Sequence, residues 1–230
     1  MSTIFYFVLV ALTSLAITPF MTAIISMYST NEKFIVKDLY KDAKFDWKVS
    51  IITSFVIIAL YYYYGTSLEF FLYSLLTILL VMEAFIDIKA KILPNTLNFV
   101  GFVIGLIYTY FVCLSNIVAG LNLIGGMILG AGIFLLISLF ALVVYKKEGM
   151  GLGDVKLMGM LGLFFGMTNI IQIFALSFFV GAIVSIILLI TRIKKASDYI
   201  AFGPFIVIAT IFTMFVPASM SMTYINQLLM

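Results

Sequence analysis

The chain has 230 residues, of which 64% are hydrophobic and 10% are charged, and its formal net charge at pH 7 is +3. Soluble domains carry about 25% charged residues, so this composition excludes a soluble globule and predicts an integral membrane protein. The small net charge argues against a nucleic-acid partner, and the single cysteine excludes a disulfide scaffold. The absence of histidine excludes His-based zinc sites and Ser-His-Asp triads.

Apolar stretches predict an all-α polytopic bundle of eight membrane helices, since a spanning helix needs about 20 mostly apolar residues. The short sixth stretch meets the seventh at Met167–Asn169, where the chain either forms a hairpin or is partly re-entrant. In chain order, the eight stretches are 3–27, 49–65, 68–87, 97–114, 123–145, 155–168, 170–191 and 202–217.

The basic residues give a prediction for the orientation of these helices. All 13 lysines and arginines fall in or beside the first, third, fifth and seventh loops. Basic residues gather in the cytoplasmic loops of membrane proteins, so we expect the odd loops inside and both termini outside. The first loop, residues 28–48, carries alternating charges, which are typical of an amphipathic helix on the membrane surface.

Two aspartates lie at predicted helix ends on the cytoplasmic side, Asp87 at the end of the third helix and Asp154 at the start of the sixth. Ionisable residues at membrane depth are costly and are often functional. Without histidine, two carboxyl groups are the smallest set that activates water against an amide. Since a helix N-terminus favours negative charge and a C-terminus disfavours it, we hypothesise that Asp154 is the resting base and Asp87 the resting acid.

Structural explanations of these residues also remain open. Asp154 could cap the sixth helix, and Asp87 could pair with Lys91 one turn later. Glu83, one turn before Asp87, tunes that carboxyl group, lines a water-filled cavity or extends to the membrane boundary. Lys156 either keeps Asp154 ionised or anchors the helix end at the lipid headgroups.

Three glycines, Gly149, Gly151 and Gly153, alternate directly before Asp154. Glycine lets another chain approach closely, and three glycines exceed what a helix cap needs. We therefore expect an extended substrate backbone to lie beside Asp154.

Two GxxxG patterns occur in the later predicted helices. Such patterns usually mark close helix packing, and in a multi-span protein most of them face internal neighbours. We therefore expect packing within the chain, and no oligomer is indicated. The patterns are Gly126 with Gly130 and Gly162 with Gly166.

At the two aspartates the sequence resembles the bacterial type IV prepilin peptidases, which belong with the archaeal preflagellin peptidases to the GxGD class of membrane aspartic proteases. Residues 148–156, EGMGLGDVK, resemble the GxGD signature, and residues 202–205, FGPF, resemble the segment that opens the family's last helix. The stretch FIDIKAKILPN is similar to the first-aspartate motif, with Asp87 at the catalytic position, Pro94 seven residues on, and Asn95 where many members carry Asp.

The resemblance implies an aspartic endopeptidase with Asp87 and Asp154 as its catalytic residues and with no metal or cofactor. It would cleave the basic leader from prepilin-like substrates at the cytoplasmic face of the cell membrane, just before their apolar segment. Its expected partners are these substrates and membrane lipid. It also implies one membrane domain over 1–230, with a peptidase core at 80–217 and divergent helices in 1–80.

Other residues near the two motifs are expected to bind substrate or to shape the site. Acidic side chains among them would attract the basic leader. The set is Glu83, Pro94, Glu148, Gly149, Gly151, Gly153, Lys156, Gly203 and Pro204.

The sequence departs from many bacterial members in one respect. They carry an N-terminal cytoplasmic domain with two zinc-binding CxxC pairs, and they also methylate the new N-terminus. Here the only cysteine, Cys113, falls in a predicted helix, so we expect neither the zinc site nor the methyltransferase. Two other functions stay open: a GxGD protease with another substrate, such as signal-peptide remnants, and a small transporter that uses the aspartates as a proton relay.

Overall fold

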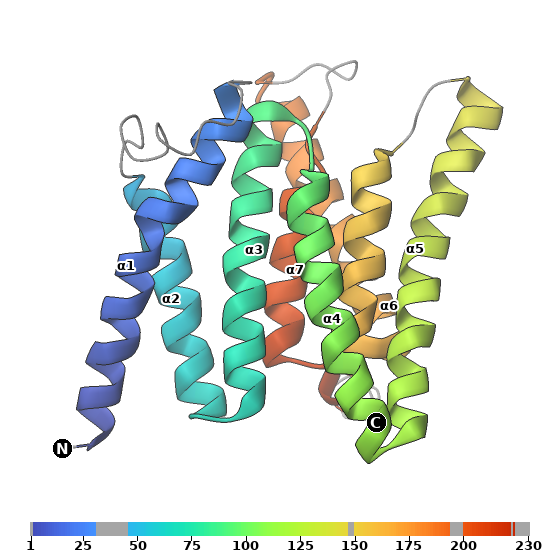
Figure 1. Ribbon diagram of the computed structural model, residues 1–230. Helices are drawn as coiled ribbons and strands as arrows, with labels where there is room; N and C mark the ends of the chain where they lie inside the picture. The colour runs from blue at the N-terminus through green and yellow to red at the C-terminus, as the bar shows by residue number, and fades with distance from the viewer. Residues whose placement is uncertain (1, 31–45, 147–149, 194–199, 222, 224–230) are drawn as a thin grey trace. The chain divides into compact units, whose positions relative to one another are not determined.

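A computed structural model describes residues 2–30, 46–146, 150–193, 200–221 and 223. Within these ranges every regular element is an α-helix, which confirms the predicted fold class (Figure 1). The chain divides into two compact units, Met1–Ile92 and Leu93–Met230. The elements are α1 (Ser2–Thr30), α2 (Trp47–Tyr64), α3 (Leu68–Ala90), α4 (Asn95–Ser115), α5 (Ile117–Tyr145), α6 (Leu152–Ile190) and α7 (Gly203–Phe215).

The eight predicted helices are present, with the sixth and seventh forming the two halves of α6. Gly166 interrupts α6 with φ 71° and ψ −178°, a backbone conformation that favours glycine. Gly130 of α5 faces Met158 from the first half and Ile170 from the second, so both halves run along α5 away from Gly166. The chain therefore turns back there (Figure 1), as both predicted alternatives, a hairpin and a partly re-entrant segment, require.

Five of the described helices, α2 to α6, are long and apolar enough to cross a membrane. The first half of α6 has 14 residues before Gly166, a length of about 21 Å, which is short for a hydrocarbon core of about 30 Å. The protein is thus a multi-pass membrane protein. Most of the predicted first loop, residues 31–45, lies outside the described residues.

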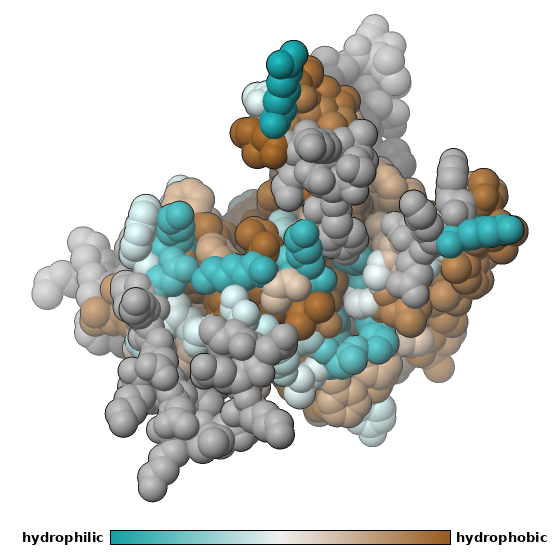
Figure 2. All heavy atoms as spheres, turned by 90° about the horizontal axis from the view of Figure 1, so that it is seen from above, coloured by the Kyte–Doolittle hydropathy of each residue, from teal (hydrophilic) through white to brown (hydrophobic). Residues whose placement is uncertain are grey.

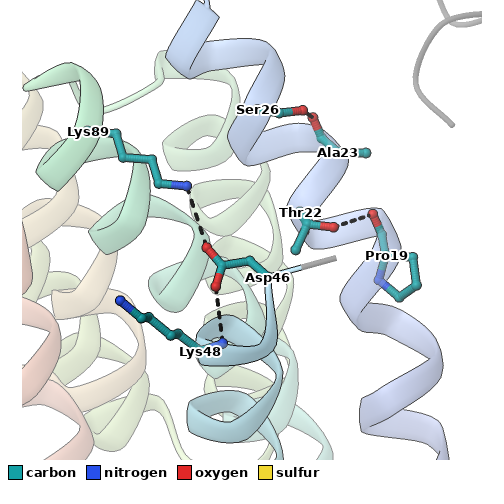
Figure 3. A network of polar contacts seen from close by, with 7 residues as sticks. All are labelled: Pro19, Thr22, Ala23, Ser26, Asp46, Lys48 and Lys89. Carbon is teal, nitrogen blue, oxygen red and sulfur yellow. Dashed lines mark hydrogen bonds and ion pairs between the residues drawn. The ribbon is translucent and has the colours of Figure 1, made fainter. Parts of the chain in front are cut away.

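In the first unit, α1, α2 and α3 pack against one another. Asp46 caps α2, because its Oδ1 accepts a hydrogen bond of 3.1 Å from the backbone N–H of Lys48. Its other oxygen lies 3.6 Å from the ammonium group of Lys89 near the end of α3. Figure 3 shows Asp46 reaching both partners. One side chain therefore ties the start of α2 to the end of α3.

Removing this side chain tests the tie. We expect Asp46→Ala to lower the free energy of unfolding by about 1 kcal/mol, the usual cost of losing an N-cap. Asp46→Asn keeps a capping oxygen and loses only the ion pair with Lys89, which is partly exposed and contributes about 1 kcal/mol or less. Thermal unfolding of both variants at low and high salt separates the two contributions. An equal loss for both variants would contradict the assignment of the cap.

In the second unit, α5 packs extensively along α6, and α4 and α7 also contact α6. A Cβ atom on Gly162 would collide with the backbone of Gly126 and Met127, and one on Gly126 would lie 2.6 Å from the carbonyl oxygen of Gly162. The two GxxxG patterns therefore face each other across the α5–α6 contact. The predicted internal packing is confirmed.

Candidate active site

Asp87 lies in the last turn of α3 and is 3% exposed. The helix ends at Lys91, which adopts a left-handed φ of 56° and donates its backbone N–H to the carbonyl oxygen of Asp87 over 2.9 Å. Pro94 then precedes α4 as its N-cap and is buried. The local sequence thus fixes Asp87 at a helix C-terminus, as predicted.

Glu83 lies one turn before Asp87 on the same side of α3. Its side chain has no exposed surface, so the alternative that it extends to the membrane boundary is wrong. Two buried carboxyl groups therefore follow each other near the end of this helix. Buried acids in a membrane protein are candidates for function.

Asp154 lies in the first turn of α6 and is 4% exposed. The N-cap of this helix is Gly151, which offers no side chain, and the backbone N–H of Asp154 donates to the carbonyl oxygen of Gly151 over 3.1 Å. The alternative that Asp154 is the N-cap is therefore wrong. Its carboxyl group lies at the end of the helix where the dipole favours negative charge.

The glycines before Asp154 differ in their surroundings. A Cβ atom on Gly153 would lie 2.8 Å from Cβ of Leu93. The residue that approaches Gly153 closely is therefore Leu93 of this chain, where a substrate backbone was expected. A Cβ atom on Gly151 would meet an oxygen of the Asp154 carboxyl group at 3.4 Å, so a side chain there would lie against that group. Gly149 and its neighbour Glu148 lie outside the described residues.

Lys156 is exposed, and its ammonium group donates a hydrogen bond of 2.7 Å to the side-chain oxygen of Asn95. This contact joins the second turn of α6 to the first residue of α4. Lys156 therefore has a structural partner in addition to the two roles expected from the sequence.

The Lys156–Asn95 contact gives a small testable effect. Asn95→Asp converts the hydrogen bond into an ion pair, and we expect about 0.2–1 kcal/mol of added stability at low salt, because exposed pairs contribute little. The gain should disappear when Lys156→Met is combined with it. A gain that survives in the double variant would show that the added charge acts elsewhere.

Gly203 and Pro204 form the first turn of α7. Phe202, just before them, lies 5.0 Å from Phe178 of α6 and 6.1 Å from Phe134 of α5 between ring centroids. The FGPF segment therefore fastens the start of α7 to α5 and α6 by aromatic packing. The place of Gly203 and Pro204 in a substrate site stays a prediction.

Sequence reasoning missed Asn98, which lies in α4 and is 3% exposed. Neither its side-chain oxygen nor its nitrogen has a hydrogen-bond partner among the described residues. An unpaired buried amide costs about 1–3 kcal/mol, so such a residue needs an explanation. The signal was an amide side chain within the apolar stretch 97–114.

The arrangement offers two buried aspartates at helix ends of opposite polarity. Asp87 belongs to the first unit and Asp154 to the second. Within the described ranges, no group of three or more Asp, Glu or Cys side chains could hold a metal ion. The chemistry available from these residues is proton transfer between carboxyl groups, water and a substrate.

Comparisons with known proteins agree with the sequence motifs. The sequence matches the type IV leader peptidase family over residues 70–186, a range that includes both aspartates but not the FGPF segment. Two similar proteins are both named prepilin leader peptidase/N-methyltransferase. The one from Aeromonas hydrophila is 35% identical over 139 residues, 59% of this chain and 46% of the relative. The one from Xanthomonas campestris is 30% identical over 163 residues, which are 70% of this chain and 55% of the relative.

The chain thus spans about half the length of the curated relatives it matches. No solved structure matches the chain.

Proposed function

Because the chain belongs to the type IV leader peptidase family, we propose that it is a membrane aspartic endopeptidase that removes the basic leader from prepilin-like proteins. The observation that carries this proposal is the family match over residues 70–186, which takes in Asp154 of the GxGD pattern and Asp87 of the first-aspartate motif. Their burial at helix ends supports it, because a carboxyl group withdrawn from bulk water is suited to holding and moving a proton.

In the proposed mechanism, the carboxyl groups of Asp87 and Asp154 act on one water molecule. Asp154 takes a proton from this water as the water oxygen attacks the carbonyl carbon of the scissile amide. Asp87 donates a proton to the carbonyl oxygen. When the tetrahedral intermediate breaks down, the C–N bond cleaves and Asp154 gives its proton to the leaving nitrogen. Asp87 takes its proton back from the carbonyl oxygen. The products are a leader that ends in a carboxyl group and a substrate with a new amino terminus.

The site is proposed to open on the cytoplasmic side of the membrane. Basic residues next to both aspartates support this, since Lys89 and Lys91 follow Asp87 and Lys156 follows Asp154. Glu148 is proposed to attract the basic leader toward the aspartates, whereas Glu83, which has no exposed surface, is proposed to tune the carboxyl group of Asp87.

We restrict the proposed activity to the peptidase. The relatives' shared name joins it to an N-methyltransferase, and the family resemblance connects methylation with members that carry two CxxC pairs. This sequence has one cysteine, so it contains no such pair.

Cleavage by the purified protein in liposomes tests the proposal. Prepilin-like proteins from the same organism are added, and products are mapped by mass spectrometry. We expect one new amino terminus, directly before the apolar segment, and product masses that sum to the substrate plus one water. Intact substrates together with proton flux through the same liposomes would favour the transporter instead.

A further inference from the structure

A groove lies within the second unit, between α4, α5 and the first half of α6. Its volume of about 910 Å³ is near the upper end of the range of about 300–1,000 Å³ for ligand pockets. In Figure 1, α4 and α5 meet at the turn between them and diverge toward the end where α6 begins. The apolar walls of the groove are formed mainly by Phe99 and Phe102 of α4, Met127, Ile128 and Leu135 of α5, and Met160 of α6.

One end of the groove lies beside the proposed catalytic residue. Val155 and Lys156, the two residues after Asp154, line it together with Asn95. Figure 2 views the end of the unit where α6 begins and shows hydrophilic residues exposed there among hydrophobic ones. A chain that left the groove at this end would pass from apolar walls to a polar rim beside Asp154.

Asn98 lines the groove, and its buried amide has no hydrogen-bond partner among the described residues. The amide offers one acceptor and two donor hydrogens. A peptide group satisfies both kinds, because it has a C=O and an N–H. The ester groups and acyl chains of a phospholipid offer no donor hydrogen, so they would leave the side-chain oxygen of Asn98 unpaired. Asn98 therefore favours a polypeptide over a lipid.

The charge of the groove rim distinguishes between the basic leader and the apolar segment of a substrate. Lys156 is a cation at the rim of the groove, and it would repel a basic leader. The walls suit an apolar segment instead, because burial of apolar surface contributes about 25 cal/mol per Å².

We propose that this groove binds the apolar segment of the prepilin-like substrate, with Asn98 hydrogen-bonded to a backbone peptide group of that segment. The inference rests on the proposed function and adds to it a binding site. If so, the apolar segment that follows the scissile bond lies in the groove and positions that bond. The leader, which precedes the bond, extends past Asp154 away from the groove.

Gly132 allows the groove to be filled without disturbing the protein. It lines the groove on α5, and an added Cβ atom would meet nothing within 4 Å. Leucine is also a better helix former than glycine. Gly132→Leu should therefore fold normally and place its side chain where the substrate would lie. Ala175→Leu adds similar bulk at an exposed position of α6 outside the groove, and it is the matched control.

The test compares two substrates on each variant, a full-length prepilin-like protein and a short peptide that ends just after the scissile bond. For Gly132→Leu we expect KM for the long substrate to rise about tenfold or more with little change in kcat, as for lost uniform binding. Cleavage of the short peptide should match the wild type, and Ala175→Leu should match it on both substrates. Unchanged KM for the long substrate in Gly132→Leu would overturn the groove proposal.

Asn98→Leu separates binding from folding. It replaces an unpaired buried amide with an apolar side chain of similar size, so we expect equal or higher thermal stability. Its KM for the long substrate should nevertheless rise severalfold, which a purely structural role would not produce. Equal KM in the variant and the wild type would remove Asn98 from the proposed site.

Photo-crosslinking identifies the occupant directly. A photoreactive amino acid is placed at Phe99, which is 65% exposed, in an inactive Asp154→Asn protein mixed with substrate. We expect the adduct in the apolar segment. An adduct confined to the leader, or one formed only with phospholipid, would overturn the proposal. Failure of the wild type to cleave any prepilin would instead sink the proposed function, so the two failures are distinguishable.

Discussion

Asp87→Asn and Asp154→Asn are each expected to lower the rate of leader cleavage by at least about a thousandfold, within the range of general acid–base contributions. Asparagine keeps the shape of the side chain but can neither take a proton from water nor supply one to a carbonyl oxygen. Asparagine and aspartate have nearly the same size, so at these two buried positions the exchange removes the ionisable group without filling or opening space. Time courses of leader release, followed by mass spectrometry, measure the loss.

Asp46→Asn is the matched control for this pair of substitutions. It also removes one carboxylate, but from the cap of α2, and it should retain a cleavage rate close to that of the wild type. Wild-type cleavage by either Asp87→Asn or Asp154→Asn would remove that aspartate from the mechanism.

Gly162→Leu is expected to destabilise the second unit by about 3 kcal/mol or more, because overpacked cores lose 1–3 kcal/mol and occasionally more. The added side chain would collide with backbone atoms of Gly126 and Met127, and no change of rotamer moves a backbone. The α5–α6 contact, which also holds the turn at Gly166, would have to separate. Thermal unfolding in detergent, read by size-exclusion chromatography, measures this effect.

Gly132→Leu makes the same chemical change in α5 where there is open space. We expect it to stay within about 1 kcal/mol of the wild type, the size of a helix-propensity difference. Equal stability of the two variants would show that the GxxxG faces do not pack as described.

The sequence predicted the number of helices and the reversal within α6 because both depend on apolar runs and on one turn. Met167–Asn169 marked the reversal to within a few residues, and the interruption itself is at Gly166. It could not decide between capping and catalysis at Asp154, because both place an acid at a helix start. The geometry shows that Gly151 is the N-cap.

The three-dimensional partners of small residues were harder to predict. Gly153 was expected to lie beside a substrate, yet it lies against Leu93. Gly132 belongs to no motif, yet it borders a groove. The sequence did not mark Asn98 as a site residue, because its importance lies in a buried side chain that has no hydrogen-bond partner among the described residues. These properties depend on which helices are neighbours, and local patterns do not contain that information.

The proposed mechanism requires that Asp87 and Asp154 meet at one water. The most direct measurement uses cysteines at both positions, Asp87→Cys and Asp154→Cys, in a Cys113→Ser background that removes the only native cysteine. A short bifunctional thiol reagent is added, and the chain is then cut at a protease site inserted at the exposed turn near Asn116. The proposed meeting of the two side chains predicts that the two fragments stay joined in the double variant and separate in each single variant. Separation in the double variant, with both cysteines shown to react individually, would contradict it.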